Sequence, residues 1–389
     1  MVDFQFAQRM DGLSGNAIRE IFKLIAQPNM ISFAGGVPSA KALRPDLVAE
    51  YAGALLAEKG PQLLQYGITE GYVPLRESIA AFTEHMGFSL SPEQILPTAG
   101  GQQVIDLLCK AVINPGDCIL VEQPTFLGAL HTMRTYQADI RGVPMDDEGV
   151  DVDALRQAIA QHRPKLVYLI PTFQNPTGKT IGLERRRALA QLAAQTQTIF
   201  IEDDPYRDLR IAGEPLPAIK SFDEAGYVVY CGSFSKLISP GLRVGYAAGN
   251  SEILRKMVIG KQAADVHTPL LNQAIIDAFL RGGKLPGMIE AACALYKKQC
   301  DTMLEELSTF RGVAHTVPEG GLFIWVTLPQ GMDSLALLPK AASRGVAYIP
   351  GVHFYPGADC TNTLRLNFSA SSLEDIRRGM GILREVIQG

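Results

Sequence analysis

Residues 165–205 read KLVYLIPTFQNPTGKTIGLERRRALAQLAAQTQTIFIEDDP, and this stretch decides the fold. Two short apolar runs, 166–170 and 199–201, lie on either side of a segment, 183–196, in which apolar residues recur at helical spacing. A strand, a helix and a second strand in this order predict two parallel strands joined by a helix that covers one face of a sheet.

The same alternation extends outward from this unit. Further short apolar runs, each opened or closed by Gly or Pro, lie at 117–124, 138–144, 226–233 and 242–249. We therefore expect an α/β fold with a mostly parallel sheet that helices cover on both faces. Because no helix of useful length separates the last two runs, we expect the sheet to end in an antiparallel strand.

The pattern of predicted helices and strands changes after about residue 280. A long charged helical pattern at 291–310 is followed by three short strand patterns and a closing helical pattern at 373–387. We expect an N-terminal arm over residues 1–45 that packs with the small domain, a large domain over 46–280, and a small α+β domain over 281–389.

Composition narrows the classes of partner. The 389 residues carry a net charge of −4 and no basic stripe, so we expect no nucleic-acid partner. No window approaches the roughly 18 apolar residues that a membrane span needs, and the first residues lack a signal-peptide pattern. The six cysteines show neither a CxxC pair nor zinc spacing. We expect a cytoplasmic protein with free thiols and no metal site.

Two short motifs resemble those of other protein classes, but each lacks residues that its class requires. Gly178-Lys179-Thr180 resembles the end of a nucleotide-binding phosphate loop, but Phe173 stands where that loop needs glycine. Ser233 and Lys236 match the SxxK pattern of penicillin-interactive serine enzymes, but the SDN-like and KTG-like elements are missing.

Polar or aromatic groups follow several of the predicted strands. They are Gly100, Gly101 and Gln102 at a helix start, Phe126, Asn175, Asp203, Tyr206, Ser233, Ser235 and Lys236. Each alone has a simple explanation, such as a tight turn, a core ring, a helix cap or a solvated lysine. Because ligands of parallel sheets bind at the carboxyl ends of the strands, we expect these groups to share one rim.

Pyridoxal 5′-phosphate requires all of these groups at once. Its phosphate suits the N–H groups of a helix start together with hydroxyls and a guanidinium. Its ring needs an aromatic face, its pyridine nitrogen a carboxylate, and its aldehyde a lysine amine. We therefore predict this cofactor.

At this point the chain resembles a known family, the class I/II aminotransferases of fold type I. The segments that carry the resemblance are NAIREIFKLIAQPNMISFAGGVP (16–38), LLQYGITEGYVPLRESIA (63–80), PTFQNPTG (171–178), SFSKLISPGLRVGY (233–246) and LRLNFS (364–369). Within the family, the 2-aminoadipate and kynurenine aminotransferases are most similar. The resemblance implies a sheet of the seven-stranded type and transfer of an amino group from an L-amino acid to a 2-oxo acid, with 2-oxoglutarate as the expected acceptor, in ping-pong fashion.

The resemblance also implies roles for individual residues. Lys236 resembles the lysine that forms a Schiff base with the cofactor, and Asp203 the partner of its pyridine nitrogen. Asn175 and Tyr206 resemble the pair that bonds the cofactor's phenolic oxygen, and Phe126 the residue that stacks on its ring. The phosphate site would comprise the backbone at Gly100, Gly101 and Gln102 together with Ser233, Ser235 and Arg243.

Further residues would bind the substrate or come from a second subunit. Tyr66 resembles a tyrosine lent across a homodimer interface to the neighbouring active site. Arg365 resembles the arginine that binds the substrate α-carboxylate, beside Gly36 and Asn175. Arg19 lies on the stretch that faces the substrate side chain in the resembling branch, and it is either a residue that meets a distal carboxylate or a helix-surface charge next to Glu20. Arg243 and Arg365 lie in apolar strand patterns, so we expect both to be buried.

The chain departs from its relatives at three places. Gly101 replaces a frequent serine, Phe126 replaces a frequent tyrosine, and Leu43-Arg44 interrupts the loop expected to cover the substrate. Two alternatives stay open at this point. The same cofactor site serves β-lyases, racemases and decarboxylases, and similar domains act as effector-binding modules of transcription regulators.

Overall fold

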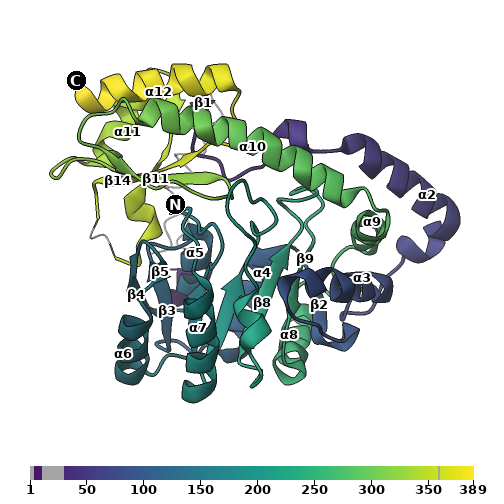
Figure 1. Cartoon of the computed structure of the whole chain (residues 1–389). Helices are drawn as coiled ribbons and strands as arrows, with labels where there is room; N and C mark the ends of the chain where they lie inside the picture. The colour runs from purple at the N-terminus through teal and green to yellow at the C-terminus, as the bar shows by residue number, and fades with distance from the viewer. Residues whose placement is uncertain (1–3, 11–29, 358–359) are drawn as a thin grey trace.

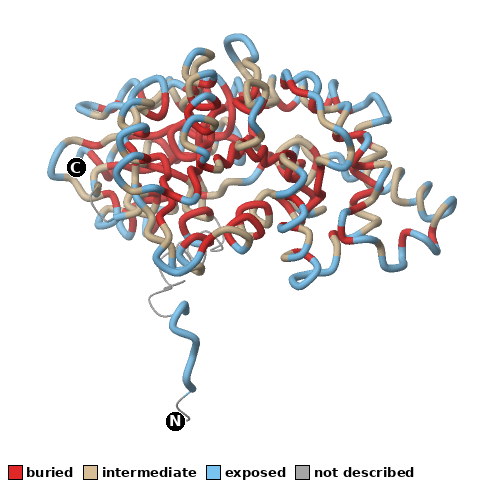
Figure 2. Tube along the Cα trace, turned by 90° about the horizontal axis from the view of Figure 1, so that it is seen from below, coloured by how far each residue is buried: buried red, intermediate tan, exposed pale blue. Residues whose placement is uncertain are grey.

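The computed structural model describes residues 4–10, 30–357 and 360–389. Figure 1 shows two layered regions, with a small sheet and its helices at the top and a large sheet with its helices below. Residues 4–10 are exposed and project from the rest of the molecule, whose interior contains the buried residues (Figure 2). Among the helices of these described residues, we find none that is both long enough and apolar enough to cross a membrane.

The large sheet has eight strands within the described residues, in the order β2-β9-β8-β7-β6-β3-β4-β5. Their bounds are β2 (Ile95–Thr98), β3 (Cys118–Gln123), β4 (Asp139–Asp146), β5 (Gly149–Val150), β6 (Leu166–Leu169), β7 (Ile199–Asp203), β8 (Val228–Ser233) and β9 (Gly245–Ala248). The neighbours β4, β3, β6, β7 and β8 are all parallel. The predicted α/β fold with a mainly parallel sheet is confirmed.

Strand β9 is antiparallel, but the prediction that it ends the sheet is wrong. It pairs antiparallel with β8 on one side and with β2 on the other, where Ile95 lies opposite Ala248. The β8–β9 connection is too short for a crossover helix, which explains the antiparallel direction. The edge position belongs to β2, a run of only four residues whose place depends on long-range pairing.

Helices cover both faces of the large sheet. They are α3 (Val73–Thr83), α4 (Gly101–Val112), α5 (Leu127–Thr135), α6 (Val152–His162), α7 (Leu183–Thr196), α8 (Ser251–Ala264) and α9 (Leu270–Arg281), and α2 (Pro45–Leu63) packs against α9. Successive strand residues enter different cores: Ile119 packs with residues of α4 and α5, whereas Leu120 packs with residues of α6 and α7. This alternation buries every residue of β6 and explains its uninterrupted apolar run.

The C-terminal region contains an antiparallel sheet in the order β10-β11-β14-β13. The elements here are β10 (Ala314–His315), β11 (Phe323–Thr327), β12 (Val346–Ala347), β13 (Ile349–Pro350), β14 (Thr363–Asn367), α10 (Leu285–Leu307), α11 (Ser334–Ser343) and α12 (Leu373–Gln388). Short 3₁₀ helices occupy Gln8–Met10, Ala40–Ala42, Glu84–Met86, Pro92–Gln94, Ile219–Phe222 and Gly351–Phe354. Strand β1 (Ile31–Ser32) pairs with β12, so this part of the predicted arm lies against the C-terminal region. The division of the chain at residues 45 and 280 stays a prediction.

Strand β9 passes close to the start of α4. A Cβ atom added at Gly245 would lie 2.7 Å from the carbonyl carbon of Gly100 and 2.8 Å from the backbone nitrogen of Gly101. Backbone atoms cannot move aside as a flexible side chain can. Glycine at position 245 therefore sets how closely β9 and α4 approach.

We predict that Gly245→Ala destabilises the protein by about 2 kcal/mol, because the added methyl group overpacks a backbone contact. Urea unfolding followed by circular dichroism measures the change. The control is Gly53→Ala in α2, where an added Cβ meets nothing within 4 Å. This control should be neutral or stabilising by up to about 1 kcal/mol. Equal unfolding midpoints for Gly245→Ala and wild type would contradict the prediction.

Candidate active site

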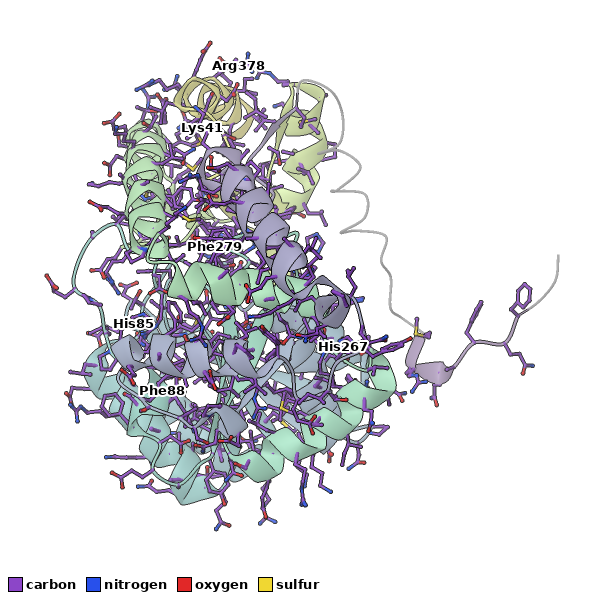
Figure 3. All side chains as sticks on the ribbon, turned by 90° about the vertical axis from the view of Figure 1, so that its right-hand side faces the viewer. Lys41, His85, Phe88, His267, Phe279 and Arg378 are labelled. Carbon is purple, nitrogen blue, oxygen red and sulfur yellow. The ribbon has the colours of Figure 1, made fainter. Side chains whose placement is uncertain are left out.

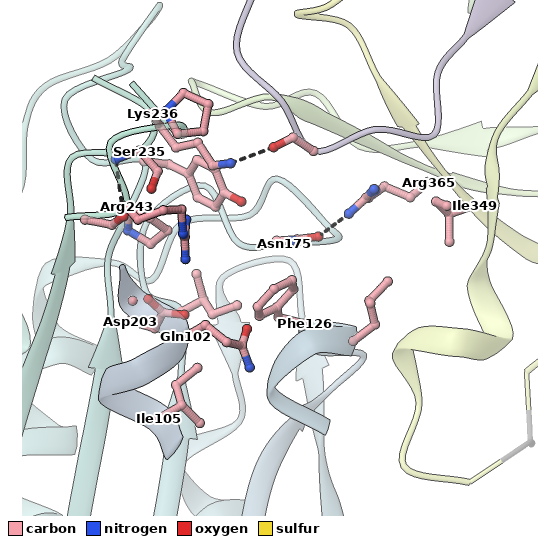
Figure 4. Close-up of a pocket in the computed structure, with 18 of the residues that line it drawn as sticks. Gln102, Ile105, Phe126, Asn175, Asp203, Ser235, Lys236, Arg243, Ile349 and Arg365 are labelled. Atoms are coloured by element: carbon pink, nitrogen blue, oxygen red, sulfur yellow. Dashed lines mark hydrogen bonds between the residues drawn. The ribbon is translucent and has the colours of Figure 1, made fainter. Parts of the chain in front are cut away.

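A cavity of about 280 Å³ lies at the carboxyl ends of the parallel strands (Figure 4). The structure brings most of the predicted site residues together around it: Gly36, Gly101, Gln102, Phe126, Asn175, Asp203, Tyr206, Ser233, Ser235, Lys236, Arg243 and Arg365. Gly100 is the residue directly before α4 and adjoins this group. The strand ends therefore meet at one rim, although the functional roles of these residues stay predictions.

One end of the cavity is suited to an anion. Helix α4 begins here after Gly100, whose φ of 83° is the left-handed conformation that glycine tolerates. The Arg243 guanidinium lies against Gly100, where a Cβ would come within 2.5 Å of it, and donates a 2.9 Å hydrogen bond to the Ala99 carbonyl. The positive end of a helix dipole, a guanidinium and the nearby hydroxyls of Ser233 and Ser235 thus converge.

The expected burial of Arg243 within a strand is wrong. Strand β9 begins only at Gly245, and Arg243 is exposed in the connection before it, with a left-handed φ of 51°. This backbone conformation turns the chain so that the guanidinium reaches the start of α4 instead of pointing into the core. Arg365, in contrast, is buried within β14 as expected, with 4% of its surface exposed.

Asp203 is the last residue of β7 and is buried. The Tyr168 hydroxyl, on the neighbouring strand β6, donates a 2.5 Å hydrogen bond to its Oδ2 atom. Burial raises the pKa of Asp203 to about 6, and the hydrogen bonds from Tyr168 and the Cys231 thiol oppose this rise. Tyr168 was not among the predicted site residues. A tyrosine in a fully buried strand needs a partner for its hydroxyl, and this was the available signal.

Lys236 follows β8 in a tight turn and is half-buried. Its Nζ atom donates a 2.6 Å hydrogen bond to the carbonyl oxygen of Gly36, which explains why Gly36 belongs to the site. Burial lowers the pKa of this amine to about 8, and the Arg365 and Arg243 charges add to the effect. An amine with this pKa is partly neutral near pH 8 and can act as a base.

Arg365 joins three distant parts of the chain. Its Nη1 atom donates to Asn175 Oδ1 at 2.8 Å, and its Nη2 atom donates to the Ala34 carbonyl at 2.6 Å. The guanidinium carbon lies 4.1 Å from the centre of the Phe323 ring and 5.0 Å from that of Phe354. Burial lowers the pKa of Arg365 to about 10.

The Nε atom of Arg365 is buried and has no hydrogen-bond partner in the described part of the chain. This donor, together with the cost of burying a cation, makes the position favourable for a carboxylate.

Two aromatic residues complete the polar rim. Phe126 directly precedes α5, and its ring contacts Gly128, where an added Cβ would lie 2.5 Å from it. Tyr206, just beyond β7, is buried, and this burial raises the pKa of its hydroxyl. Its ring lies edge-on to Phe323 at 5.8 Å.

The remaining predicted residues are not among those that line the cavity in the described part of the chain. Tyr66 is 81% exposed, and its ring lies edge-on to His267 at 5.9 Å on the outer surface of the subunit. Arg19 lies outside the described residues. The loop departure at Leu43-Arg44 is not among the described residues that line the cavity, and Arg44 instead forms an ion pair with Asp46 at the start of α2.

Aliphatic lining residues were missed altogether. Those that contact the cavity are Ile105, Leu127, Ile170 and Ile349. Ile349 lies directly opposite Arg365 in the β13–β14 pairing, so it borders the place where a carboxylate would bind. Nothing in an isolated aliphatic residue distinguishes a cavity wall from a core position, so only the tertiary structure identifies them.

Comparison with known proteins gives consistent results. Residues 28–383 match the family described as aminotransferase class I and II. The chain is 41% identical to aromatic-amino-acid aminotransferase 1 of Thermococcus litoralis, over 98% of this chain and 94% of that protein.

Two solved structures are similar over nearly their whole length. Pyrococcus horikoshii kynurenine aminotransferase in complex with PMP superposes with a TM-score of 0.94 at 39% identity, over 98% of this chain and 96% of that chain. The α-aminoadipate aminotransferase of Thermus thermophilus, complexed with N-(5′-phosphopyridoxyl)-L-leucine, gives 0.91 at 36% identity, over 99% and 97%.

The fold and the rim together define a pyridoxal-phosphate enzyme of fold type I. The residues fit this cofactor: a helix start and a guanidinium for the phosphate, an aromatic ring, a buried carboxylate and an amine surround one cavity. Gly101 lies beside these groups, since an added Cβ there would meet Cys231 Sγ at 3.2 Å and Asp203 Oδ1 at 3.8 Å. The chain belongs to the class I and II aminotransferases, and its substrates are an amino acid and a keto acid.

We predict that Asp203→Asn stabilises the cofactor-free protein above pH 6. Because the pKa of Asp203 is raised to about 6 in the folded chain from a usual 3.8, the ionised carboxylate opposes folding. The penalty is absent below the unfolded pKa, appears as the pH rises, and is complete above the folded pKa. The gain near pH 7.5 should approach about 3 kcal/mol and shrink towards pH 4.

Urea unfolding at both pH values measures this gain. The control is Asp147→Asn, whose carboxylate is fully exposed and should have little effect. An Asp203→Asn protein that is less stable than wild type near pH 7.5 would be inconsistent with a penalty from burial.

Proposed function

We propose that this aminotransferase transfers the amino group of an L-amino acid to 2-oxoglutarate in a ping-pong cycle centred on Lys236. The observation that carries the proposal is that the Lys236 amine, the Asp203 carboxylate and the Arg365 guanidinium border the same cavity. Each is buried enough for its pKa to move towards neutrality, which is typical of groups that act on a substrate.

Bound pyridoxal phosphate supplies an electron sink for the bond broken at the substrate Cα. Lys236 would hold the cofactor covalently, and its released amine would take the proton from Cα and return it to the cofactor carbon. The pKa of about 8 suits both transfers. Asp203 would keep the pyridine nitrogen protonated, and Tyr168 fixes the orientation of its carboxylate.

Other residues would orient the cofactor. The backbone N–H groups of Gly101 and Gln102, with Ser233, Ser235 and Arg243, would bind the phosphate. The Gln102 amide is already used, because its Nε2 atom donates to the Gly128 carbonyl at 2.9 Å, so its backbone is the available group. Phe126 would stack on the ring, and Asn175 and Tyr206 would bond the phenolic oxygen.

The residues that line the cavity support a preference for certain amino-acid substrates as amino donors. Arg365 would bind the α-carboxylate, and the adjacent lining residues Leu127 and Ile349 are aliphatic. These contacts favour donors with apolar or aromatic side chains. The distal carboxylate of 2-oxoglutarate would bind Arg19, as the resemblance implies for this position.

The thiols support a cytoplasmic location. All six cysteines are free, and Cys109, Cys118, Cys231 and Cys300 are buried. Free buried thiols are typical of proteins in a reducing compartment.

A half-reaction experiment tests the proposed cycle. An L-amino acid added alone should convert the bound cofactor to its pyridoxamine form without release of ammonia, and 2-oxoglutarate should then restore the original absorbance. Lys236→Ala should slow the conversion by at least about a thousandfold. Lys297→Ala, an exposed lysine on α10, is the control. Release of ammonia would point to lyase chemistry, and an unaffected Lys236→Ala protein would exclude this lysine as the base.

We also propose a homodimer in which Tyr66 contributes to the neighbouring subunit's phosphate site. Three large apolar side chains close together in sequence, Leu64, Tyr66 and Ile68, are 73%, 81% and 56% exposed. Figure 3 views the side of the subunit where this segment meets His267, which accepts a hydrogen bond from the Gly67 backbone N–H. An exposed apolar cluster of this kind favours a subunit interface.

Mixing two inactive variants tests this arrangement. If Tyr66 acts across the interface, heterodimers of Tyr66→Ala and Lys236→Ala chains contain one intact site each. Random mixing should then make roughly a quarter of all sites fully active, well above either parent. If Tyr66 acted within its own subunit, mixing would restore nothing. Sedimentation checks the dimer, and Ile68→Asp should weaken it whereas Val317→Asp, at an exposed position outside this segment, should not.

A further inference from the structure

Ala99, the second residue before α4, is held at both of its backbone polar groups. The Ala99 carbonyl accepts a 2.9 Å hydrogen bond from Arg243, and the Ala99 N–H donates a 2.8 Å hydrogen bond to Gln103 Oε1. Ala99 directly precedes Gly100, after which α4 begins. The two bonds therefore fix the backbone directly before the first N–H groups of the helix.

Behind Gln103 lies a lysine that is fully buried, with 0% of its surface exposed. This residue, Lys261 on α8, donates to Gln103 Oε1 at 2.7 Å and to the two Asp265 carboxylate oxygens at 3.0 and 2.9 Å. Gln103 Nε2 in turn donates to Asp265 at 2.8 Å. Lys261, Gln103 and Asp265 thus form a closed ring of hydrogen bonds next to the phosphate site.

Filling this space with a buried ammonium group costs desolvation free energy. Desolvation of a charge costs more than an ion pair usually returns, and an apolar side chain of similar volume often stabilises a protein as well or better. The charge does provide a strong, directional hydrogen bond to the one oxygen that also accepts from Ala99. Packing alone therefore does not explain Lys261, whereas orientation of Gln103 does.

We propose that Lys261 is a positioning residue for the cofactor phosphate. Through Gln103 it holds the Ala99 N–H, and it thereby directs the N–H groups at the start of α4 towards the phosphate. The proposal rests on the phosphate site proposed above, and it adds two side chains, Lys261 and Gln103, that have no place among the groups touching the cofactor.

The test compares two ligands that differ only in the phosphate. The full-length chain is stripped of cofactor, and the dissociation constants of pyridoxal 5′-phosphate and of pyridoxal are measured from the absorbance change on reaction with the lysine amine. In Lys261→Met, the constant for pyridoxal 5′-phosphate should rise about tenfold, as expected for loss of a charge-assisted hydrogen bond. The constant for pyridoxal should change by less than about twofold, because pyridoxal has no phosphate.

Matched variants make the comparison specific. Lys256→Met removes an exposed lysine from the same helix and should leave both constants unchanged. Gln103→Leu should reproduce the effect of Lys261→Met, and the double variant should be no weaker than either single one, because both act through the same bond.

Two results for Lys261→Met would overturn the proposal. Equal weakening of both ligands would show that Lys261 only stabilises the fold, and unchanged binding would show that it does not act on the phosphate site. If Lys261→Met does not fold, Gln103→Leu decides the same comparison. A wild-type protein that binds both ligands equally would instead contradict the phosphate site itself.

Discussion

The parallel direction of β3, β6, β7 and β8 is the constraint on which the site depends. It brings the carboxyl ends of four neighbouring strands to one edge. Phe126, Asn175 and Lys236 follow the ends of β3, β6 and β8, and Asp203 is the last residue of β7. Parallel strands also require helices on both faces, so the faces of the sheet are closed to ligands. The antiparallel β9 then starts from the same edge, which returns Arg243 to the rim that Lys236 occupies.

Burial is the common cause of the electrostatics in this cavity. It raises the pKa of Asp203 and lowers the pKa values of Lys236 and Arg365, so all three groups are less stable as ions than they would be in water. In the proposed roles, a cationic pyridine nitrogen beside Asp203, a covalent bond to the Lys236 amine and an anionic carboxylate at Arg365 would each relieve one of these costs. Burial of these three groups thus destabilises the cofactor-free chain, and it also makes the cavity electrostatically complementary to the proposed ligands.

The local pattern of apolar and polar residues predicts much of this structure. It fails where the position of an element depends on contacts with residues far away in sequence. The βαβ unit at 165–205, the strand-end residues and the buried Arg365 follow from apolar periodicity and from the rule for parallel sheets. The edge position of β2 and the turn at Arg243 do not, because each depends on a neighbour far away in sequence. Tyr168 and Lys261 were missed for a related reason: their partners Asp203 and Gln103 are 35 and 158 residues away.

The three residues that meet at the carboxylate position, Ala34, Asn175 and Arg365, are synthesised at different times. Arg365 bonds Ala34, 331 residues earlier, and Asn175, 190 residues earlier. The groups assigned to the phosphate and the ring, from Gly100 to Arg243, all leave the ribosome before Arg365 is made. Because domains form in order of synthesis, a growing chain completes the groups proposed to hold the cofactor before it makes the arginine proposed to bind the substrate α-carboxylate.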